Sequence, residues 1–445
     1  MTRSTDRPIA YQPTDGLSYD PAEPRYWEPG ALAKEVERTF EICHGCRMCF
    51  KYCDAFPALF GAIDERHDGD VGKVTAAETQ AVMGDCFQCK LCEVQCPYTP
   101  REQHEFQLDF PALVHRFKAQ QRRTGRPTLR DRFLANPDRA GVLARLSLGM
   151  ANVAARIRPL RRMMERVLGV HRDKLLPPFA RQTFETWARR EGRTDGGPGG
   201  EVVLFQTCYV QHNEPQLGID TLEVLEQNGV DVRCAAGLVC CGMPAWERGD
   251  IDAVRRQAAQ NLRVLGPFVD QGVKVAAINP TCSMMMRREH PHLVAEQDRA
   301  AAERLSAAIV DPSEFLWSIR NEPRFSTKFQ SSPRGTIAYH APCHLRAQGV
   351  GFKGRDLLRK LPDVEIAASV LECSGHDGTY AMTVEGFEPS ARIGRKAFDA
   401  MQAAEAKLWA TDCPLAAIQF EQHAGVRPLH PMTILARAYR GDPWT

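Results

Sequence analysis

The sequence lacks several features that would assign it to a common class of protein. No stretch of its 445 residues approaches the roughly 20 consecutive apolar residues that a membrane-spanning helix needs. The polar, proline-dotted N-terminus, residues 1–24, has no apolar core of a signal peptide. The arginines are not interleaved with aromatic residues, and no nucleic-acid-binding motif is present. We therefore predict a cytoplasmic chain with no membrane-spanning helix and no nucleic-acid partner.

Net charge is also low, but the charges are unevenly distributed. The formal net charge is +2, whereas residues 101–200 contain 21 lysines and arginines against 10 aspartates and glutamates. This local surplus predicts a basic segment that faces an anionic membrane surface or an acidic partner.

Cysteine, in contrast, is abundant, with 16 residues. Half of them form two runs that each read C-x2-C-x2-C-x3-C: Cys43, Cys46, Cys49 and Cys53, then Cys86, Cys89, Cys92 and Cys96. This spacing holds [4Fe–4S] clusters in two-cluster ferredoxins, where the last cysteine of each run binds the other run's cluster. We therefore predict one cluster on Cys43, Cys46, Cys49 and Cys96, and another on Cys86, Cys89, Cys92 and Cys53.

Two other uses of these eight cysteines fit less well. Disulfides need an oxidising compartment, which a chain without an export signal does not enter. Structural zinc sites usually pair two C-x2-C units, and here each run carries four cysteines. The runs therefore indicate an electron carrier.

The pattern along the chain predicts five segments. Residues 1–30 form an extended arm, which Tyr11, Tyr19, Tyr26 and Trp27 pin against a domain. Residues 31–110 form a helical dicluster ferredoxin module, with helices over 31–42 and 75–83, and residues 111–195 form a basic helical connector. After a linker at 194–200, strands at 202–206, 273–278, 336–340 and 407–411 alternate with helices. The predicted fold class is α + α/β, a helical module followed by two Rossmann-like α/β repeats at 196–320 and 321–445.

The connector carries an apolar stripe at helical spacing between residues 143 and 167, surrounded by arginines, and Pro159 should kink or divide this helix. Such a helix could lie in a membrane interface, giving peripheral membrane contact through 140–170. Amphipathicity is also the ordinary signature of a helix packed on its own protein, and we favour that interpretation.

The remaining cysteines follow an internal repeat, in which residues 202–290 and 336–425 match as two copies of one unit. Each copy has a strand that ends near a cysteine, a C-x-G triplet about thirty residues later, and a further strand that ends at a cysteine. The first copy keeps Cys208, Cys240, Cys241 and Cys282; the second keeps Cys343, Cys373 and Cys413. Thiols at strand ends can be gathered around one metal centre, although buried core cysteines are the alternative.

This unit resembles the cysteine-rich CCG domain of heterodisulfide reductase catalytic subunits, whose full pattern is C…CCG…CPxC. A dicluster module followed by two such domains is similar to the iron–sulfur C subunit of anaerobic glycerol-3-phosphate dehydrogenase and to the glycolate oxidase iron–sulfur subunit. The first copy has Asn279 where the full pattern has cysteine, and its four thiols suffice for a third iron–sulfur cluster. In the second copy Ser374 and Ala416 replace two ligands.

The second copy therefore leaves three outcomes open. It could hold a cluster or a zinc ion with His340, His344 or His376 as a fourth ligand, because Cys3His is a common structural zinc set. It could equally bind no metal.

Two further patterns are weak. Gly349, Gly351 and Gly354 fit a dinucleotide fingerprint but follow a cysteine-bearing loop, so we interpret them as supporting that loop. Met284, Met285 and Met286 are interpreted as core residues.

Together these patterns predict an iron–sulfur electron-transfer protein. It would be a subunit of a membrane-associated oxidoreductase, peripheral on the inner face of the cytoplasmic membrane, that passes electrons between a flavoprotein dehydrogenase and a quinone or other acceptor. Two alternatives stay open. One is a heterodisulfide-type reductase with catalysis at the first CCG cluster. The other is an electron donor to a diiron or peroxide-reducing protein.

Overall fold

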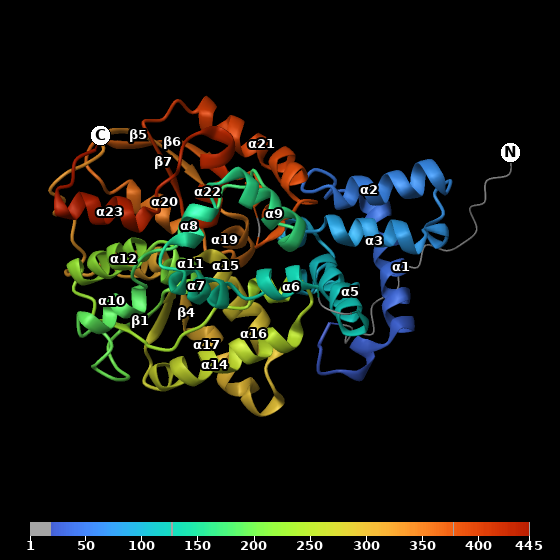
Figure 1. Cartoon of the computed structure of the whole chain (residues 1–445), viewed down its shortest axis with the longest axis horizontal. Helices are drawn as coiled ribbons and strands as arrows, with labels where there is room; N and C mark the ends of the chain where they lie inside the picture. The colour runs from blue at the N-terminus through green and yellow to red at the C-terminus, as the bar shows by residue number, and fades with distance from the viewer. Residues whose placement is uncertain (1–18, 126–127, 377, 445) are drawn as a thin grey trace. The chain divides into compact units, whose positions relative to one another are not determined.

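The computed structural model describes residues 19–125, 128–376 and 378–444. Its chain divides into two compact units: residues up to Arg126 together with Glu247–Gly249, and Pro127–Trp246 together with Asp250–Thr445 (Figure 1). The first 18 residues of the expected arm lie outside the described residues. Its remainder is not extended, because residues Pro24–Trp27 form the short helix η1 and α1 begins at Pro29.

The first unit is helical, as predicted. Its elements are α1 (Pro29–Cys46), α2 (Ala55–Gly61), η2 (Ala62–Arg66), η3 (Val71–Lys73), α3 (Ala76–Asp85), α4 (Leu91–Gln95), η4 (Pro100–Glu102) and α5 (Phe110–Thr124). A capping box between Thr75 and Glu78 starts α3. The helix α5 belongs to this unit rather than to a connector, because Phe110, Leu113 and Val114 lie in its core.

The basic segment forms several short helices instead of one long one. They are α6 (Leu129–Leu134), α7 (Pro137–Leu146), α8 (Met150–Ala154), α9 (Arg158–Leu168) and α10 (Phe184–Arg190). Pro159 stands in the first turn of α9, so the predicted division occurs there. A second break was not predicted: Leu148 and Gly149 both adopt left-handed backbone conformations between α7 and α8.

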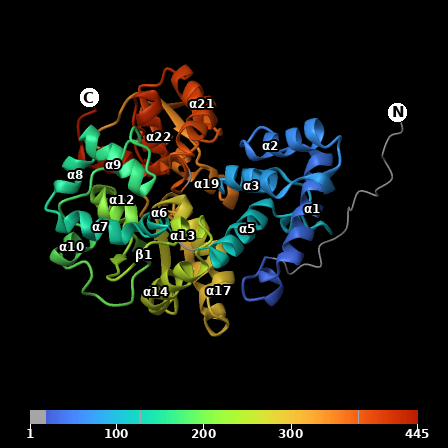
Figure 2. The ribbon, with the colours of Figure 1, turned by 45° about the vertical axis from the view of Figure 1, so that its right-hand side comes forward.

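Two parallel sheets follow, which confirms the predicted α/β repeats. The first has the strand order β2-β1-β3-β4, with β1 (Val202–Phe205), β2 (Val232–Cys234), β3 (Lys274–Ala277) and β4 (Ile309–Val310). Its helices are α11 (Thr207–His212), α12 (Pro215–Gln227), α13 (Met243–Trp246), α14 (Ile251–Val269), α15 (Pro280–Met284), η5 (Met285–Glu289), α16 (His290–Leu293), η6 (Glu296–Asp298), α17 (Arg299–Ala308) and α18 (Pro312–Ser318). Figure 2 shows α14 and α17 beside this sheet, where both contact β3.

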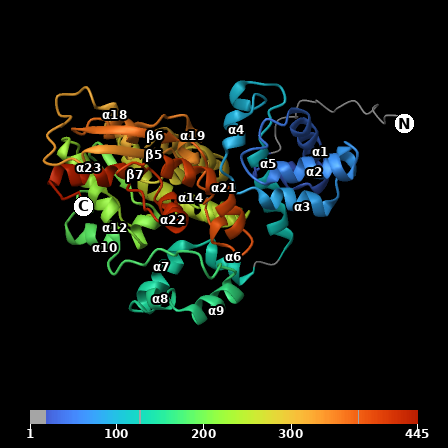
Figure 3. The ribbon, with the colours of Figure 1, turned by 90° about the horizontal axis from the view of Figure 1, so that it is seen from above.

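The second sheet has the order β6-β5-β7, and Figure 3 shows its strands side by side. They are β5 (Gly335–His340), β6 (Val364–Val370) and β7 (Leu408–Thr411), with α19 (Cys343–Gln348), α20 (Lys353–Leu358), η7 (Tyr380–Met382), α21 (Phe387–Ala403), α22 (Pro414–Ala424) and α23 (Pro431–Arg440). Because β5 pairs in parallel with both neighbours, the carboxyl ends of all three strands meet at one edge.

One apolar core connects the two repeats. Val202 and Leu204 of β1, Ile337 and Tyr339 of β5, and Met432 of α23 are all at most 2% exposed and belong to the same cluster of buried side chains. The two strand-end edges that carry cysteines are therefore parts of one packed body.

Candidate metal centres

The second cysteine run lines a cavity in the first unit. Four thiols, from Cys53, Cys86, Cys89 and Cys92, line one small pocket, together with apolar side chains that include Phe56 and Phe110. A ring of thiols in an apolar wall is the donor set that a [4Fe–4S] cluster requires. The residues therefore fit the predicted cluster, including the fourth ligand contributed by the other run.

In the first run, the cysteines Cys43 and Cys49 have Cys96 of the second run as a neighbour. Burial raises the pKa of the Cys43 thiol, and the neighbouring thiols Cys49, Cys96 and Cys46 raise it further. Burial likewise raises the pKa of Cys49 to about 12, with Cys96 as the largest charge contribution. These contacts group Cys96 with the first run and support the predicted ligand sets, which stay predictions.

Both runs use the same local backbone turn. The residue after the second cysteine of each run, Arg47 or Lys90, adopts a left-handed conformation with φ of 56° or 59°. Residues other than glycine adopt this conformation uncommonly. The matching turns indicate that the two runs fold as copies of one ligand loop.

The first repeat brings its four predicted thiols together at the end of its sheet. Cys208 lies on α11 after β1, and Cys282 lies on α15 after β3. The thiols of Cys208 and Cys240, of Cys240 and Cys241, and of Cys241 and Cys282 lie close enough to shift each other's pKa. Asn279 is not part of this group, because its side-chain oxygen accepts a hydrogen bond from Thr281 N–H at 3.0 Å and caps α15.

Three polar residues that the sequence did not single out support these thiols. Asp138 of α7 accepts a hydrogen bond from the backbone N–H of Cys240 at 2.8 Å. The buried Asn261 donates to the carbonyls of Val239 and Cys240, and His290 Nε2 contacts the carbonyl oxygen of Cys241 at 2.7 Å. Their sequence separations of 21 to 102 residues left no local pattern to reveal them.

In the second repeat Cys343 and Cys373 lie close together, and Cys413 caps the start of α22. The Cys343 thiol donates a hydrogen bond that lowers the pKa of Cys373. Backbone N–H groups donate to sulfur at two positions, from Gly375 to Cys373 at 3.3 Å and from Ala416 to Cys413 at 3.4 Å. Thiolates bound to iron accept such bonds, so Cys373 and Cys413 each have a donor that a metal-bound sulfur would use.

The glycine of each C-x-G triplet has a defined role. Gly242 and Gly375 adopt φ of +94° and +74°, and each donates its N–H to the cysteine two residues before it, at 3.5 and 3.3 Å. A Cβ atom at Gly375 would clash with the Ser390 carbonyl oxygen. Only glycine therefore combines the left-handed turn with this close approach.

The histidines proposed as a fourth ligand have different surroundings. Both ring nitrogens of His340 are engaged, with Thr411 Oγ1 at 3.0 Å and the Glu372 carbonyl at 3.1 Å. His344 Nδ1 contacts Thr281 Oγ1 at 2.9 Å, whereas His376 Nδ1 is buried without a partner. Among the described residues, no group of three or more His, Cys, Asp or Glu side chains is arranged to hold a single metal ion.

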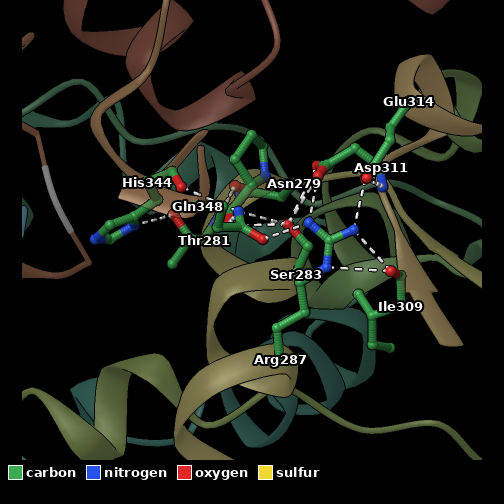
Figure 4. A network of polar contacts seen from close by, with 10 residues as sticks. Asn279, Thr281, Ser283, Arg287, Ile309, Asp311, Glu314, His344 and Gln348 are labelled. Atoms are coloured by element: carbon green, nitrogen blue, oxygen red, sulfur yellow. Dashed lines mark hydrogen bonds and ion pairs between the residues drawn. The ribbon is translucent and has the colours of Figure 1, made fainter. Parts of the chain in front are cut away.

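A buried polar network joins the ligand helices of the two repeats (Figure 4). Gln348 Nε2 of α19 donates to the Pro280 carbonyl at 3.1 Å and to Ser283 Oγ at 3.0 Å on α15. Ser283 in turn donates to Asp311, whose pKa burial raises to about 7. Because Cys282 and Cys343 lie on these two helices, the network fixes the two thiol groups relative to each other.

The weaker sequence patterns have structural explanations. Gly349 and Gly351 lie in the turn between α19 and α20, both with positive φ, and a Cβ at Gly354 would clash with the Asp412 carboxylate. These glycines serve a tight turn and close packing beside Cys413, in line with our interpretation of the motif. Met284, Met285 and Met286 are fully buried, as core residues are.

The helices α7, α8 and α9 present an apolar surface that our preferred interpretation of the stripe did not predict. Large side chains here are strongly exposed, with Leu146 at 72%, Leu148 at 94% and Met150 at 73%. The same surface, which we call the α7–α9 surface, includes Val142, Leu143, Val153, Ile157, Leu160, Met163 and Val167. The same three helices and the turns between them also carry exposed arginines: Arg139, Arg145, Arg156, Arg158, Arg162 and Arg166. Figure 3 shows α8 and α9 away from the strands β5–β7, so the stripe is not packed on the sheets.

None of the helices within residues 19–125, 128–376 and 378–444 is both long enough and apolar enough to cross a bilayer. Apolar patches of this kind on a protein surface usually mark a site of interaction with a partner or a membrane.

Comparison with known families agrees with these two kinds of centre. Residues 42–99 match a 4Fe-4S dicluster domain, and residues 202–287 and 337–421 each match a cysteine-rich CCG domain. These matches confirm the predicted module and the predicted repeat.

Several characterised proteins are similar to the chain. The C subunit of anaerobic glycerol-3-phosphate dehydrogenase from Escherichia coli strain K12 is 29% identical over 316 residues, which are 71% of this chain and 78% of that protein. The B subunit of fumarate reductase (CoM/CoB) from Methanothermobacter marburgensis is 26% identical over 256 residues, 55% of this chain and 48% of that protein. Lactate utilization protein A from Bacillus velezensis is 27% identical over 187 residues, 41% and 75% of the two chains.

Proposed function

Because the chain joins one 4Fe-4S dicluster domain to two cysteine-rich CCG domains, we propose that this iron–sulfur electron-transfer protein is a subunit of a membrane-associated oxidoreductase. It would receive electrons from a flavoprotein dehydrogenase and pass them to a quinone or another acceptor. The similarity to the C subunit of anaerobic glycerol-3-phosphate dehydrogenase supports a dehydrogenase partner. The observation that carries the proposal is the cavity of four thiols that combines Cys53 with Cys86, Cys89 and Cys92.

The eight cysteines of the two runs would hold two [4Fe–4S] clusters, and Cys208, Cys240, Cys241 and Cys282 would hold a third iron–sulfur cluster. Such clusters supply one-electron redox chemistry when they are bound. The protein itself supplies soft thiolate ligands, apolar walls that exclude water, and N–H groups that stabilise sulfur charge. A further redox centre would be held by Cys343, Cys373 and Cys413. The N–H···S hydrogen bonds to Cys373 and Cys413, which resemble the one to Cys240 in the first repeat, support this.

Electron transfer is testable without knowing the physiological partners. The anaerobically purified protein is mixed with photoreduced flavin mononucleotide as the donor and then with a water-soluble naphthoquinone as the acceptor. The proposal predicts that the iron–sulfur absorption in the visible range bleaches with the flavin and recovers with the quinone. A protein that keeps its full absorption in the presence of excess reduced flavin would contradict it.

We further propose that the α7–α9 surface binds the inner face of the cytoplasmic membrane. Exposed leucines, valines and methionines could enter the acyl boundary, while the exposed arginines of the same helices would face anionic headgroups. Complete burial of one large apolar side chain stabilises such a complex by about 1.5–3 kcal/mol. Several side chains together would therefore hold the protein at the bilayer without a membrane-spanning segment.

Flotation with vesicles that contain anionic phospholipid tests this contact. Leu148→Asp should lower the partition coefficient by at least about tenfold, because it removes the most exposed apolar side chain of the surface. Val426→Asp, on a residue that is 41% exposed outside this surface, is the matched control and should change little. Absence of binding by the parent protein at low salt would exclude the membrane contact.

A further inference from the structure

One peptide group beside the thiols of the first repeat is hydrogen-bonded on both of its sides. The N–H of Gly242 donates to the sulfur of Cys240 at 3.5 Å. The carbonyl of the same peptide group belongs to Cys241, and its oxygen lies 2.7 Å from Nε2 of His290. The peptide is trans, so its N–H and its C=O point in opposite directions. A chain of contacts therefore runs from the imidazole ring through the backbone to a predicted ligand sulfur.

The partner of His290 fixes the direction of its hydrogen bond. A carbonyl oxygen can only accept, so Nε2 carries the hydrogen and donates it. The other ring nitrogen, Nδ1, is buried without a hydrogen-bond partner among the described residues, and the residue is only 2% exposed. Burial of an unpartnered polar atom destabilises a fold, and an apolar side chain would avoid that cost. The contact made by Nε2 therefore explains this histidine better than stability does.

The local fold holds the ring of His290 in this place. Helix α15 carries Cys282, and a single π-helical turn, η5, leads from it to α16, which begins at His290. Such turns are rare, and they occur frequently at functional sites. Arg255 of α14 donates to the Leu293 carbonyl at 2.9 Å, which holds α16 against α14.

The second repeat has the same turn without the histidine. Gly375 N–H donates to the sulfur of Cys373 at 3.3 Å, and the carbonyl of this peptide group belongs to Ser374. That oxygen faces Gly394 of α21, where a Cβ atom would lie 2.5 Å from it. Glycine has no side chain with which to donate a hydrogen bond, so the imidazole contact distinguishes the first repeat from the second.

A hydrogen bond to a ligand sulfur makes an iron–sulfur centre easier to reduce. The added electron increases the negative charge on sulfur, and an N–H that points at the sulfur stabilises this charge. A donor on the carbonyl side polarises the peptide and strengthens its N–H as a donor, by roughly 10–30% per bond. At Cys240 the two contacts act through one peptide group.

We propose that His290 raises the midpoint potential of the centre on the four thiols of the first repeat by polarising the peptide group between Cys241 and Gly242. This inference rests on the proposed function, because it assumes an iron–sulfur centre on those thiols. His290 is a positioning residue, since it acts through the backbone and not on the centre itself. One electron enters the centre, and the hydrogen stays on Nε2.

The test is the midpoint potential of this centre in His290→Phe, which keeps an aromatic ring and removes the donor. The centre is identified in the anaerobically reconstituted protein by the EPR signal that is lost in Cys240→Ser. The equilibrium constant for its reduction should fall about two- to fivefold. At 59 mV per tenfold change in a one-electron couple, this is a shift of roughly 20–40 mV to more negative potential.

Three further variants complete the test. His290→Gln keeps an amide N–H that can reach the carbonyl, and it should restore the parent potential. His292→Phe, at an exposed position on the same helix, is the matched control and should leave the potential unchanged. His290→Met is a second variant without a donor, for the case that a phenyl ring prevents assembly of the centre.

Several results would overturn the inference. They are an unchanged potential in a donor-free variant that assembles the centre, an equal shift in His290→Gln, and failure of both donor-free variants to assemble it. The absence of any parent signal sensitive to Cys240→Ser would do the same. If reduced flavin still bleaches the protein in these cases, the proposed electron-transfer function stands, because the two cysteine runs carry it.

Discussion

Replacing Lys174 by methionine should make the protein more stable at neutral pH, and the gain should shrink as the pH rises. Lys174 titrates at about 7 in the folded protein because it is buried, whereas a free lysine titrates at about 10.4. Between these values the unfolded chain binds more protons than the folded one, so the stability of the parent rises with pH. Methionine has a similar length and carries no proton, so it removes this dependence.

The size of the effect follows from the two pKa values. One pKa unit corresponds to about 1.36 kcal/mol. From pH 7 to pH 9 the parent should therefore gain roughly 2 kcal/mol relative to Lys174→Met, because both limits lie inside the window between about 7 and 10.4. His376 and His423 should not contribute, since burial lowers the pKa of both below that of a free histidine.

Urea unfolding under anaerobic conditions, followed by tryptophan fluorescence at both pH values, measures this difference. Lys328→Met, at an exposed position, is the matched control and should follow the parent. A difference between parent and Lys174→Met that stays constant from pH 7 to pH 9 would refute the reasoning, because Lys174 would then titrate normally in the folded protein.

Two further predictions concern single positions. Cys53→Ser should remove the same EPR signal as Cys86→Ser and lower the iron content by about four per chain, because both side chains line one cavity; Cys234→Ser, a buried cysteine on β2, should leave iron and signals unchanged. Gly375→Ala should destabilise the protein by about 3 kcal/mol or more in the same urea assay, because strain and a clash with the Ser390 carbonyl combine. Gly349→Ala has a similar φ of +70° but open space around it, so it should cost only about 1 kcal/mol; equal losses in the two variants would contradict this account of the C-x-G turn.

The sequence predicted the strands that carry long apolar runs, and it missed the others. Residues 202–206, 273–278, 336–340 and 407–411 correspond to β1, β3, β5 and β7, which are central in their sheets or follow long helices. Strands β2 and β4 have only three and two residues, too few to show a pattern. In β6, an edge strand, exposed residues alternate with partly buried ones, so its sequence lacks an apolar run.

The connector shows why helix packing is harder to predict than helix formation. Its apolar stripe was recognised, but the break at Leu148 and Gly149 and the exposure of the stripe were not. An amphipathic pattern indicates that a helix has two faces, and it does not indicate what covers the apolar face. For the same reason we assigned α5 to the connector, whereas it packs in the first unit. Only tertiary contacts place Phe110 and Leu113 in the core of that unit.

The candidate site was predictable where it depends on cysteine spacing. The eight ferredoxin-type cysteines and the repeated strand-end thiols follow from the chain alone. The polar residues around them do not, because Asp138 reaches Cys240 across 102 residues and His290 reaches Cys241 across 49. Such contacts depend on the tertiary fold and leave no periodic signal.

The central claim is that this chain carries electrons on clusters held by its two cysteine runs. Iron and acid-labile sulfide, quantified in the anaerobically purified and reconstituted protein and compared with EPR after reduction, test it most directly. We expect at least about eight iron and eight sulfide per chain from the two runs, about four more of each if the first repeat is loaded, and reducible [4Fe–4S] signals. Fewer than about eight iron per chain after reconstitution, or iron that reduction does not convert to such signals, would contradict the claim.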